Sequence, residues 1–240
     1  MSNWEPNKLA RFGGFLYLII IAISIYGELF VRASLIDVSD IEITTSNILG
    51  SLSLWKLALA LDYLLIVCGI TLAYIYFSLF KHVNKNIIFL FLFFNLTAFV
   101  VESTSKINLL SIQLMLEQPI NIDTSMLHAN VQHALHLYSY NFNLGMMFIG
   151  FGCLVLGSLF IRSQMLPIIL GRMIQLAGVC YVSNTFIQLL AYDVFLKASP
   201  FILMPAFIAE VSLCLWLLVF GVKTREDYSA DEDSYEESLA

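Results

Sequence analysis

The sequence predicts an all-α protein that crosses a membrane six times as a helical bundle. Of its 240 residues, 59% are hydrophobic and only 12% are charged, whereas a soluble domain carries about 25% charged residues. The mean hydropathy of the chain is +0.82. The apolar residues also gather in six stretches, each long enough to cross the hydrocarbon core of a bilayer as a helix. The chain is therefore expected to be a multi-pass integral membrane protein.

The six apolar stretches predict the six spans. The first is too long for a signal peptide, it contains Glu28, and no cleavage site follows it. The basic segment Lys81–Asn86 predicts a tight loop, and Pro167 suits the first turn of the fifth span. Asp193–Ser199 is expected to be a loop before Pro200. The predicted spans are residues 12–31, 56–80, 87–116, 133–161, 167–192 and 200–222.

The chain divides into a membrane domain over residues 1–225 and an acidic tail over residues 226–240. The tail holds seven acidic residues and no basic one, so it cannot bury a core and is expected to be disordered. Without the tail, 11 acidic residues stand against 12 basic ones, so the net charge of −6 describes the tail and not the body. Within the membrane domain, apolar residues spaced through Asp40–Leu54 predict a short surface helix.

Basic residues near the spans predict the orientation, because Lys and Arg are enriched on the cytoplasmic side of a membrane. Eight lie on the side of the two termini and four on the opposite side. The first set is Lys8, Arg11, Lys81, Lys85, Arg162, Arg172, Lys223 and Arg225, and the second is Arg32, Lys56, Lys106 and Lys197. The chain is therefore expected in the cell inner (plasma) membrane with both termini in the cytoplasm.

Three segments of the chain resemble a known family. They are RFGGFLYLIIIAISIYGELFVRASLI, LGSLFIRSQMLPIILGRMIQLAGVCYVSNTF and PAFIAEVSLCLWLLVFGVK. Together they make the chain similar to a family of prokaryotic six-span membrane proteins known as domain of unknown function 4386. The similarity covers nearly the whole chain except the acidic tail. It implies an all-helical membrane fold, and it implies no activity, substrate or catalytic residue.

Four acidic residues inside the predicted spans are the main candidates for function, because an ionisable group inside a membrane is costly. These are Glu28, Asp62, Glu102 and Glu210. At a rise of about 1.5 Å per residue, Glu28 and Glu102 lie about 24 and 23 Å from the cytoplasmic starts of their spans. Asp62 lies about 9 Å from the opposite face. In a core about 30 Å thick, these three share the outer half, and Glu210 lies nearer the middle.

Other polar residues are expected to join these acids. Arg32 and Lys106 follow Glu28 and Glu102 by one helical turn, which places each base beside an acid. The remaining candidates are His136, Asn143, Asn184 and Gln188. Each polar stripe is expected to face the bundle interior, because lipid would leave its groups unpaired. The sequence therefore predicts a polar pocket that opens to the extracytoplasmic side and is closed by apolar packing on the cytoplasmic side.

Three functions remain open at this point. In the first, the pocket binds, senses or transports a small solute, an ion or a lipid head group, with the acids supplying charge or carrying protons. In the second, the chain is a metal-dependent intramembrane enzyme. His133 and His136 lie three residues apart on one helix face, and a nearby acid would complete the site. In the third, the chain is a non-catalytic accessory subunit whose ion pairs only fix the packing.

Several other classes have no support in the sequence. It contains no Walker loop, dinucleotide motif, G-x-S-x-G or H-E-x-x-H, so no cofactor and no catalytic motif are expected, and nothing indicates nucleic-acid binding. A binding protein is therefore favoured over an enzyme. Its expected partners are the lipid bilayer and a small ligand. A transporter of only six spans would also be expected to form a homo-oligomer.

Overall fold

The computed structural model describes residues 4–118 and 123–223, and in that part all regular secondary structure is helical. The elements are α1 (Pro6–Ile25), η1 (Tyr26–Arg32), α2 (Ala33–Leu35), α3 (Ile41–Gly50), α4 (Leu52–Phe80), α5 (Lys85–Glu117), α6 (Thr124–Ser163), α7 (Ile168–Leu190) and α8 (Tyr192–Val219). Six segments are long and apolar enough to cross a membrane, the first being α1, η1 and α2 together. The predicted all-α membrane bundle is confirmed. The tail, predicted to be disordered, lies outside the described residues.

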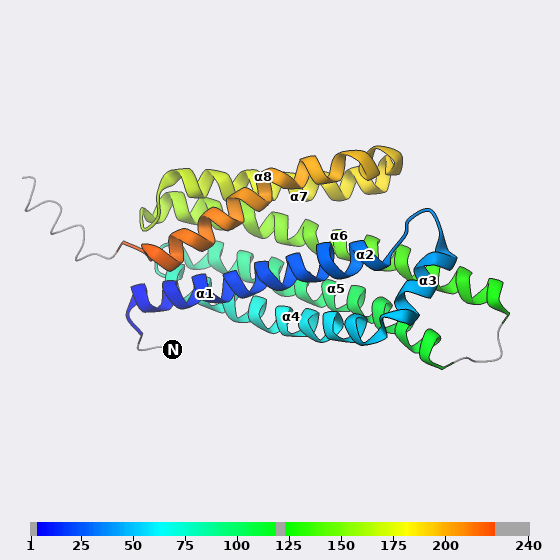
Figure 1. Cartoon of the computed structure of the whole chain (residues 1–240). Helices are drawn as coiled ribbons and strands as arrows, with labels where there is room; N and C mark the ends of the chain where they lie inside the picture. The colour runs from blue at the N-terminus through cyan, green and yellow to red at the C-terminus, as the bar shows by residue number, and fades with distance from the viewer. Residues whose placement is uncertain (1–3, 119–122, 224–240) are drawn as a thin grey trace, which may run out of the picture.

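The six long helices run alongside one another and define two ends of the bundle (Figure 1). At one end, the start of α1 meets the end of α8. There the Arg11 guanidinium donates to the Val219 carbonyl (3.3 Å), and Asn7 Oδ1 accepts from the Val222 amide (2.9 Å). We call this the terminus end, and it also holds the α4–α5 and α6–α7 connections. The opposite end, which holds α3 and the α7–α8 junction, is called the α3 end.

Several helices extend beyond the predicted spans. Asp193–Ser199, predicted as a loop, is helical, so Pro200 and Pro205 lie inside α8. A membrane helix tolerates an internal proline because neighbouring groups satisfy the freed carbonyls. Hydropathy marks only the part of a helix inside the hydrocarbon, so the polar start of α6, residues 124–132, lies outside the predicted fourth span. The α4 helix also begins earlier than predicted, at Leu52. The predicted surface helix is shorter than expected and forms α3, where the Asp40 carboxylate caps the first turn.

The α6 and α7 helices pack at very short range through two pairs of glycines. A Cβ atom at Gly157 would lie 2.5 Å from the Gly171 carbonyl oxygen, and a Cβ at Gly178 would lie 2.5 Å from that of Gly150. Contacts this short require glycine at all four positions. In lipid, helix association depends on van der Waals packing, and small residues allow the backbones to approach.

Gly157→Ala is expected to destabilise the fold by about 1–2 kcal/mol, because the added methyl group forces α6 and α7 apart. Gly50→Ala is the matched control, since a Cβ at Gly50 would meet no atom within 4 Å. Urea unfolding of the two variants in detergent micelles, followed by circular dichroism, measures the difference. Equal midpoints for the two variants would show that the α6–α7 contact is not as tight as described.

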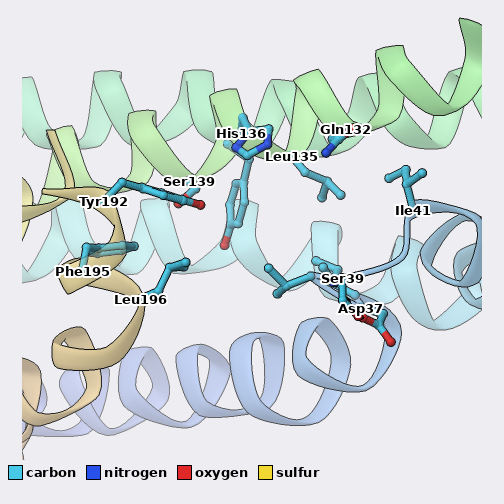
Figure 2. A pocket seen from close by; sticks show the side chains of 13 residues that line it. Asp37, Ser39, Ile41, Gln132, Leu135, His136, Ser139, Tyr192, Phe195 and Leu196 are labelled. Atoms are coloured by element: carbon cyan, nitrogen blue, oxygen red, sulfur yellow. Dashed lines mark hydrogen bonds between the residues drawn. The ribbon is translucent and has the colours of Figure 1, made fainter.

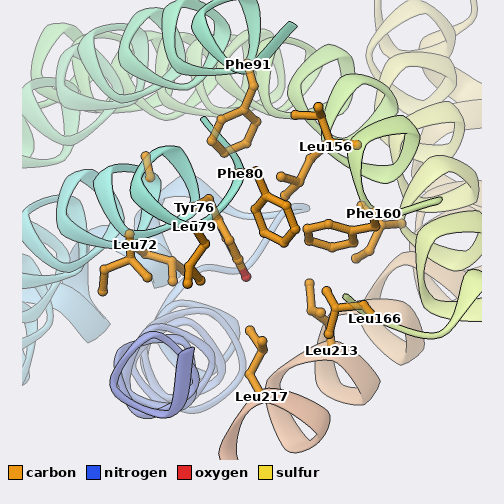
Figure 3. Packing of buried hydrophobic residues seen from close by; sticks show 14 of the residues in the cluster. Leu72, Tyr76, Leu79, Phe80, Phe91, Leu156, Phe160, Leu166, Leu213 and Leu217 are labelled. Carbon is orange, nitrogen blue, oxygen red and sulfur yellow. The ribbon is translucent and has the colours of Figure 1, made fainter. Parts of the chain in front are cut away.

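Buried apolar side chains form two separate clusters. The larger one fills the terminus half of the bundle, where the Tyr76 and Phe160 rings pack edge to face and the Phe80 ring packs tilted against Phe160 (Figure 3). The smaller one lies at the α3 end and is composed of Val31, Leu35, Ile48, Trp55, Ala58, Leu59, Leu109, Ile112, Leu116, Val131, Ala134 and Tyr138. Most of the buried charged side chains lie between these two clusters.

Candidate functional site

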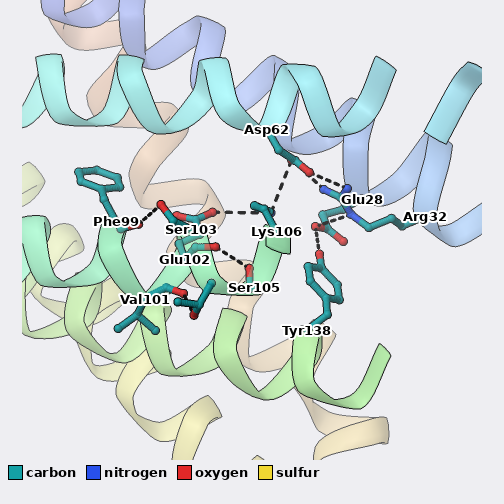
Figure 4. Close-up of polar contacts among 11 residues, drawn as sticks. Glu28, Arg32, Asp62, Phe99, Val101, Glu102, Ser103, Ser105, Lys106 and Tyr138 are labelled. Atoms are coloured by element: carbon teal, nitrogen blue, oxygen red, sulfur yellow. Dashed lines mark hydrogen bonds and ion pairs between the residues drawn. The ribbon is translucent and has the colours of Figure 1, made fainter. Parts of the chain in front are cut away.

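Five of the predicted site residues converge between the two apolar clusters and form an ion network (Figure 4). They are Glu28, Arg32, Asp62, Glu102 and Lys106. Arg32 is its centre. Its Nη1 and Nη2 donate to Asp62 Oδ2 and Oδ1 at 2.9 and 3.0 Å, and its Nε donates to Glu28 Oε1 at 2.9 Å. The planar guanidinium fits a carboxylate in this two-bond geometry. Arg32 is 4% exposed and Asp62 1%, so the pair is removed from solvent.

Lys106 is the second base of the network and is held more loosely. Its Nζ lies 3.5 Å from Asp62 Oδ1 and 3.8 Å from Glu102 Oε1, and the residue is 1% exposed. The same ammonium lies over the rings of Tyr138 (5.5 Å) and Phe142 (5.4 Å). Within the described residues, the network therefore contains three carboxylates and two bases, and Lys106 is the one ionic partner of Glu102.

Gly27 and Tyr138 complete the network, and sequence reasoning missed both. The segment η1 is a π-helix, whose wider turn carries both Glu28 and Arg32. A Cβ at Gly27 would lie 2.8 Å from Arg32 Nη2, so glycine leaves the space that the guanidinium occupies. The Tyr138 hydroxyl donates to Glu28 Oε1 at 2.6 Å. A glycine directly before an intramembrane acid is a signal that could have found Gly27.

Glu210 is not part of the ion network. It accepts a hydrogen bond of 2.6 Å from the Tyr181 hydroxyl, and Tyr17 also contacts it. Among the described residues, Glu210 forms no ion pair with Arg32 or Lys106, because Asp62 engages both bases and α8 packs against α1 and α7.

A cavity of about 260 Å³ lies inside the bundle and is lined by both Glu102 and Glu210. We call it the central cavity. Its other polar lining is Tyr17, Ser24, Tyr76, Asn95, Cys153 and Tyr181, and the remainder is apolar. The Tyr76 hydroxyl is buried and has no hydrogen-bond partner in the described part of the chain. The lining residues of α4 and α6 follow Asp62 and Tyr138 along the chain, so the cavity lies on the terminus side of the network.

A family model described as Domain of unknown function (DUF4386) matches residues 12–221 of the chain. The chain belongs to this family. The match covers nearly the whole described bundle and confirms the resemblance inferred from the three sequence segments. No curated protein and no solved structure matches the chain. The function of this DUF4386 protein must therefore be argued from the network and the cavity.

The cavity of the DUF4386 protein differs from the predicted pocket in two ways. It is mainly apolar, and apolar side chains of the smaller cluster pack at the α3 end, where the sequence predicts an opening. This packing does not close the network off, because the Glu28 side chain is 37% exposed and its partner Tyr138 lines a pocket at the α3 end. The physical reason is that counting residues along a helix gives the depth of a charged side chain in the membrane, but not which side chains of other helices cover it. Ile48 of α3 and Trp55 of α4, both fully or nearly fully buried, belong to this covering layer.

The three amide candidates form a group of their own between α6 and α7. Asn184 Nδ2 donates to Asn143 Oδ1 (2.8 Å), and Gln188 Nε2 donates to Ser139 Oγ (2.8 Å). Thr185 Oγ1 donates to the Asn143 carbonyl (2.7 Å). These bonds join the two helices on the α3 side of the glycine contact, as polar side chains do between membrane helices. None of the described bonds connects them to the ion network.

His136 lies in a second pocket, of about 340 Å³, at the α3 end of the DUF4386 protein (Figure 2). Tyr192 and Asp37 line the same pocket. The Ser39 hydroxyl and amide donate to Asp37 at 2.6 and 2.9 Å, which holds the pKa of that carboxyl below its ordinary value. His136 and its neighbour His133 are exposed. Among residues 4–118 and 123–223, no three His, Cys, Asp or Glu side chains lie together as a metal site.

Proposed function

We propose that this DUF4386 protein binds a small solute, an ion or a lipid head group inside the membrane, as a step in sensing or transporting it. The observation that supports this is the central cavity of about 260 Å³, which meets carboxylates from α5 and α8. An apolar cavity of about 150 Å³ already holds benzene. Sites for small ligands typically combine apolar walls with a few polar groups that orient the ligand, and the central cavity has this composition.

Glu102 would transmit the binding event, because it belongs to both the cavity and the ion network. Its only ionic partner in the described chain is Lys106, at 3.8 Å. A ligand that packs against Glu102 would change the contact of this carboxylate with Lys106 and shift that base towards Asp62. Asp62 is bonded to Arg32 of η1, so this rearrangement of the ion pairs would extend to the first span. A sensor or a transporter requires such a connection between its ligand site and a span, whereas a purely structural ion pair does not need one.

A substitution that fills the cavity tests the proposal. The full chain, reconstituted in nanodiscs, would be heated with a panel of small amines, carboxylic acids, alcohols and sugars. At 100 times its Kd, a ligand is expected to stabilise the fold by about 2.7 kcal/mol. Met146→Trp, which places an indole in the cavity, should abolish the stabilisation. Leu215→Trp on the exposed face of α8 should retain it.

The accessory-subunit alternative makes the opposite prediction for the same experiment. If no compound raises the melting temperature of the wild type, and native mass spectrometry finds no small molecule retained by the purified protein, the binding proposal is wrong. A partner protein that copurifies with the chain in stoichiometric amounts would then support the alternative.

We also propose that the terminus end faces the cytoplasm. At the α3 end Arg32 and Lys106 are engaged in the ion network, and Lys56 forms an ion pair with Glu117. The accessible positive charge therefore lies mainly at the terminus end. Single cysteines at Asp40 and Asp123 should react with a membrane-impermeant maleimide added to intact cells. A cysteine at Asn84 should react only after lysis, and the reverse pattern would invert the orientation.

A further inference from the structure

We infer that the ligand of the central cavity is an organic cation, a protonated amine with an apolar body, and that its ammonium group lies beside Glu210. This inference rests on the proposed function and names its ligand class. Two carboxylates, Glu102 and Glu210, line the cavity, and no Lys, Arg or His does so among the described residues. The cavity therefore presents two carboxyl groups without a base of its own.

The charge balance around the cavity favours a cation. The ion network has three carboxylates and two bases, and Arg32 is occupied by Asp62 and Glu28. Glu210 accepts from Tyr181 and forms no ion pair within residues 4–118 and 123–223. A carboxylate in a membrane interior is costly unless it is paired. A cation beside Glu210 would supply the missing partner.

The cavity walls are suited to an ammonium group. Six aromatic residues line them, namely Tyr17, Tyr76, Phe91, Phe99, Phe142 and Tyr181. Aromatic rings attract ammonium ions through their negative faces. The chain already holds one ammonium in this way, since Lys106 lies over the rings of Tyr138 and Phe142. The unpartnered Tyr76 hydroxyl, on a residue that is only 5% exposed, offers an acceptor to an N–H group.

The position of the ammonium group follows from the competing cations. Glu102 already has Lys106, whereas the hydrogen-bond partners of Glu210 among the described residues are the Tyr181 and Tyr17 hydroxyl groups. The apolar body would then fill the rest of the cavity towards Glu102. A bare metal ion would fit less well, because hard cations prefer six or more oxygen ligands, and most of this lining is apolar.

A matched series of three compounds tests the inference: hexylamine, hexanol and hexanoate, which share one chain and differ in the charge of the head group. Binding to the full chain in nanodiscs of zwitterionic lipid would be measured by calorimetry, with empty nanodiscs subtracted. Wild type is expected to bind hexylamine about tenfold or more tightly than hexanol, and hexanoate more weakly still. Glu210→Gln should lose that preference while keeping its affinity for hexanol. Glu42→Gln, on the exposed face of α3, should behave as wild type.

Each other result has a distinct meaning. If hexanol binds wild type as tightly as hexylamine does, or if hexanoate binds best, the cation inference is wrong while the proposed binding function stands. If none of the three binds, and the wider panel also fails, the proposed function fails as well. If Glu42→Gln loses the preference for hexylamine over hexanol as Glu210→Gln does, the amine binds outside the cavity and the inference is wrong. The wild-type ranking decides the charge preference even where Glu210→Gln does not fold.

Discussion

Replacing Arg32 by alanine is expected to destabilise the folded protein by about 3–5 kcal/mol, the cost of leaving a buried charge without its partner. Asp62, which is 1% exposed, would lose two hydrogen bonds of 2.9 and 3.0 Å. It would retain only the longer contact of 3.5 Å with Lys106. Urea unfolding in detergent micelles, followed by circular dichroism, measures the loss.

Two comparisons make the Arg32 result specific. Lys8 and Glu5 form an ion pair whose side chains are both 71% exposed, so Lys8→Ala should cost less than about 1 kcal/mol. The double variant Arg32→Leu/Asp62→Leu should be less destabilised than the two single changes added together, because it leaves neither charge unpaired. If Arg32→Ala costs no more than Lys8→Ala, the network is hydrated or neutral and the description of it as a buried ionic centre is wrong.

Phe160→Ala is expected to destabilise the fold by about 2–4 kcal/mol and to open the central cavity towards the terminus end. Phe160 is fully buried, and its ring lies 5.0 Å from that of Phe80 and 6.0 Å from that of Tyr76. Removing the ring leaves a void of about 100 Å³, and each Å³ of void lowers the stability of the fold by roughly 24 cal/mol. The free energy gained by moving the ring into the core is smaller than in a soluble protein, because lipid is as apolar as the core.

The opening can be measured through Cys153, which lines the cavity. In a chain whose other three cysteines, Cys68, Cys180 and Cys214, are replaced by alanine, a small water-soluble thiol reagent should modify Cys153 faster after Phe160→Ala. Phe93→Ala serves as the control, since Phe93 is 66% exposed on the outer surface of the bundle. A loss of stability without faster modification of Cys153 would show that another layer closes the cavity.

The sequence by itself determined the class of the protein, the number of membrane helices and the family. It also identified the pairing of Glu28 with Arg32, which the structure shows at 2.9 Å. These features are local or additive. Hydropathy sums over a stretch of residues, and two side chains four residues apart on a helix are neighbours whatever surrounds them. For the same reason Lys106 lies near Glu102.

Only the tertiary structure decided which groups meet between helices. Arg32 binds Asp62 across 30 residues of sequence, Glu28 binds Tyr138 across 110, and Glu210 binds Tyr181 across 29. Whether two such side chains meet depends on the rotation and offset of whole helices, which close packing of many small contacts sets together. No local pattern encodes that result. Glu210 therefore lies among tyrosines beside a cavity, and not with the bases, because α8 packs against α1 and α7.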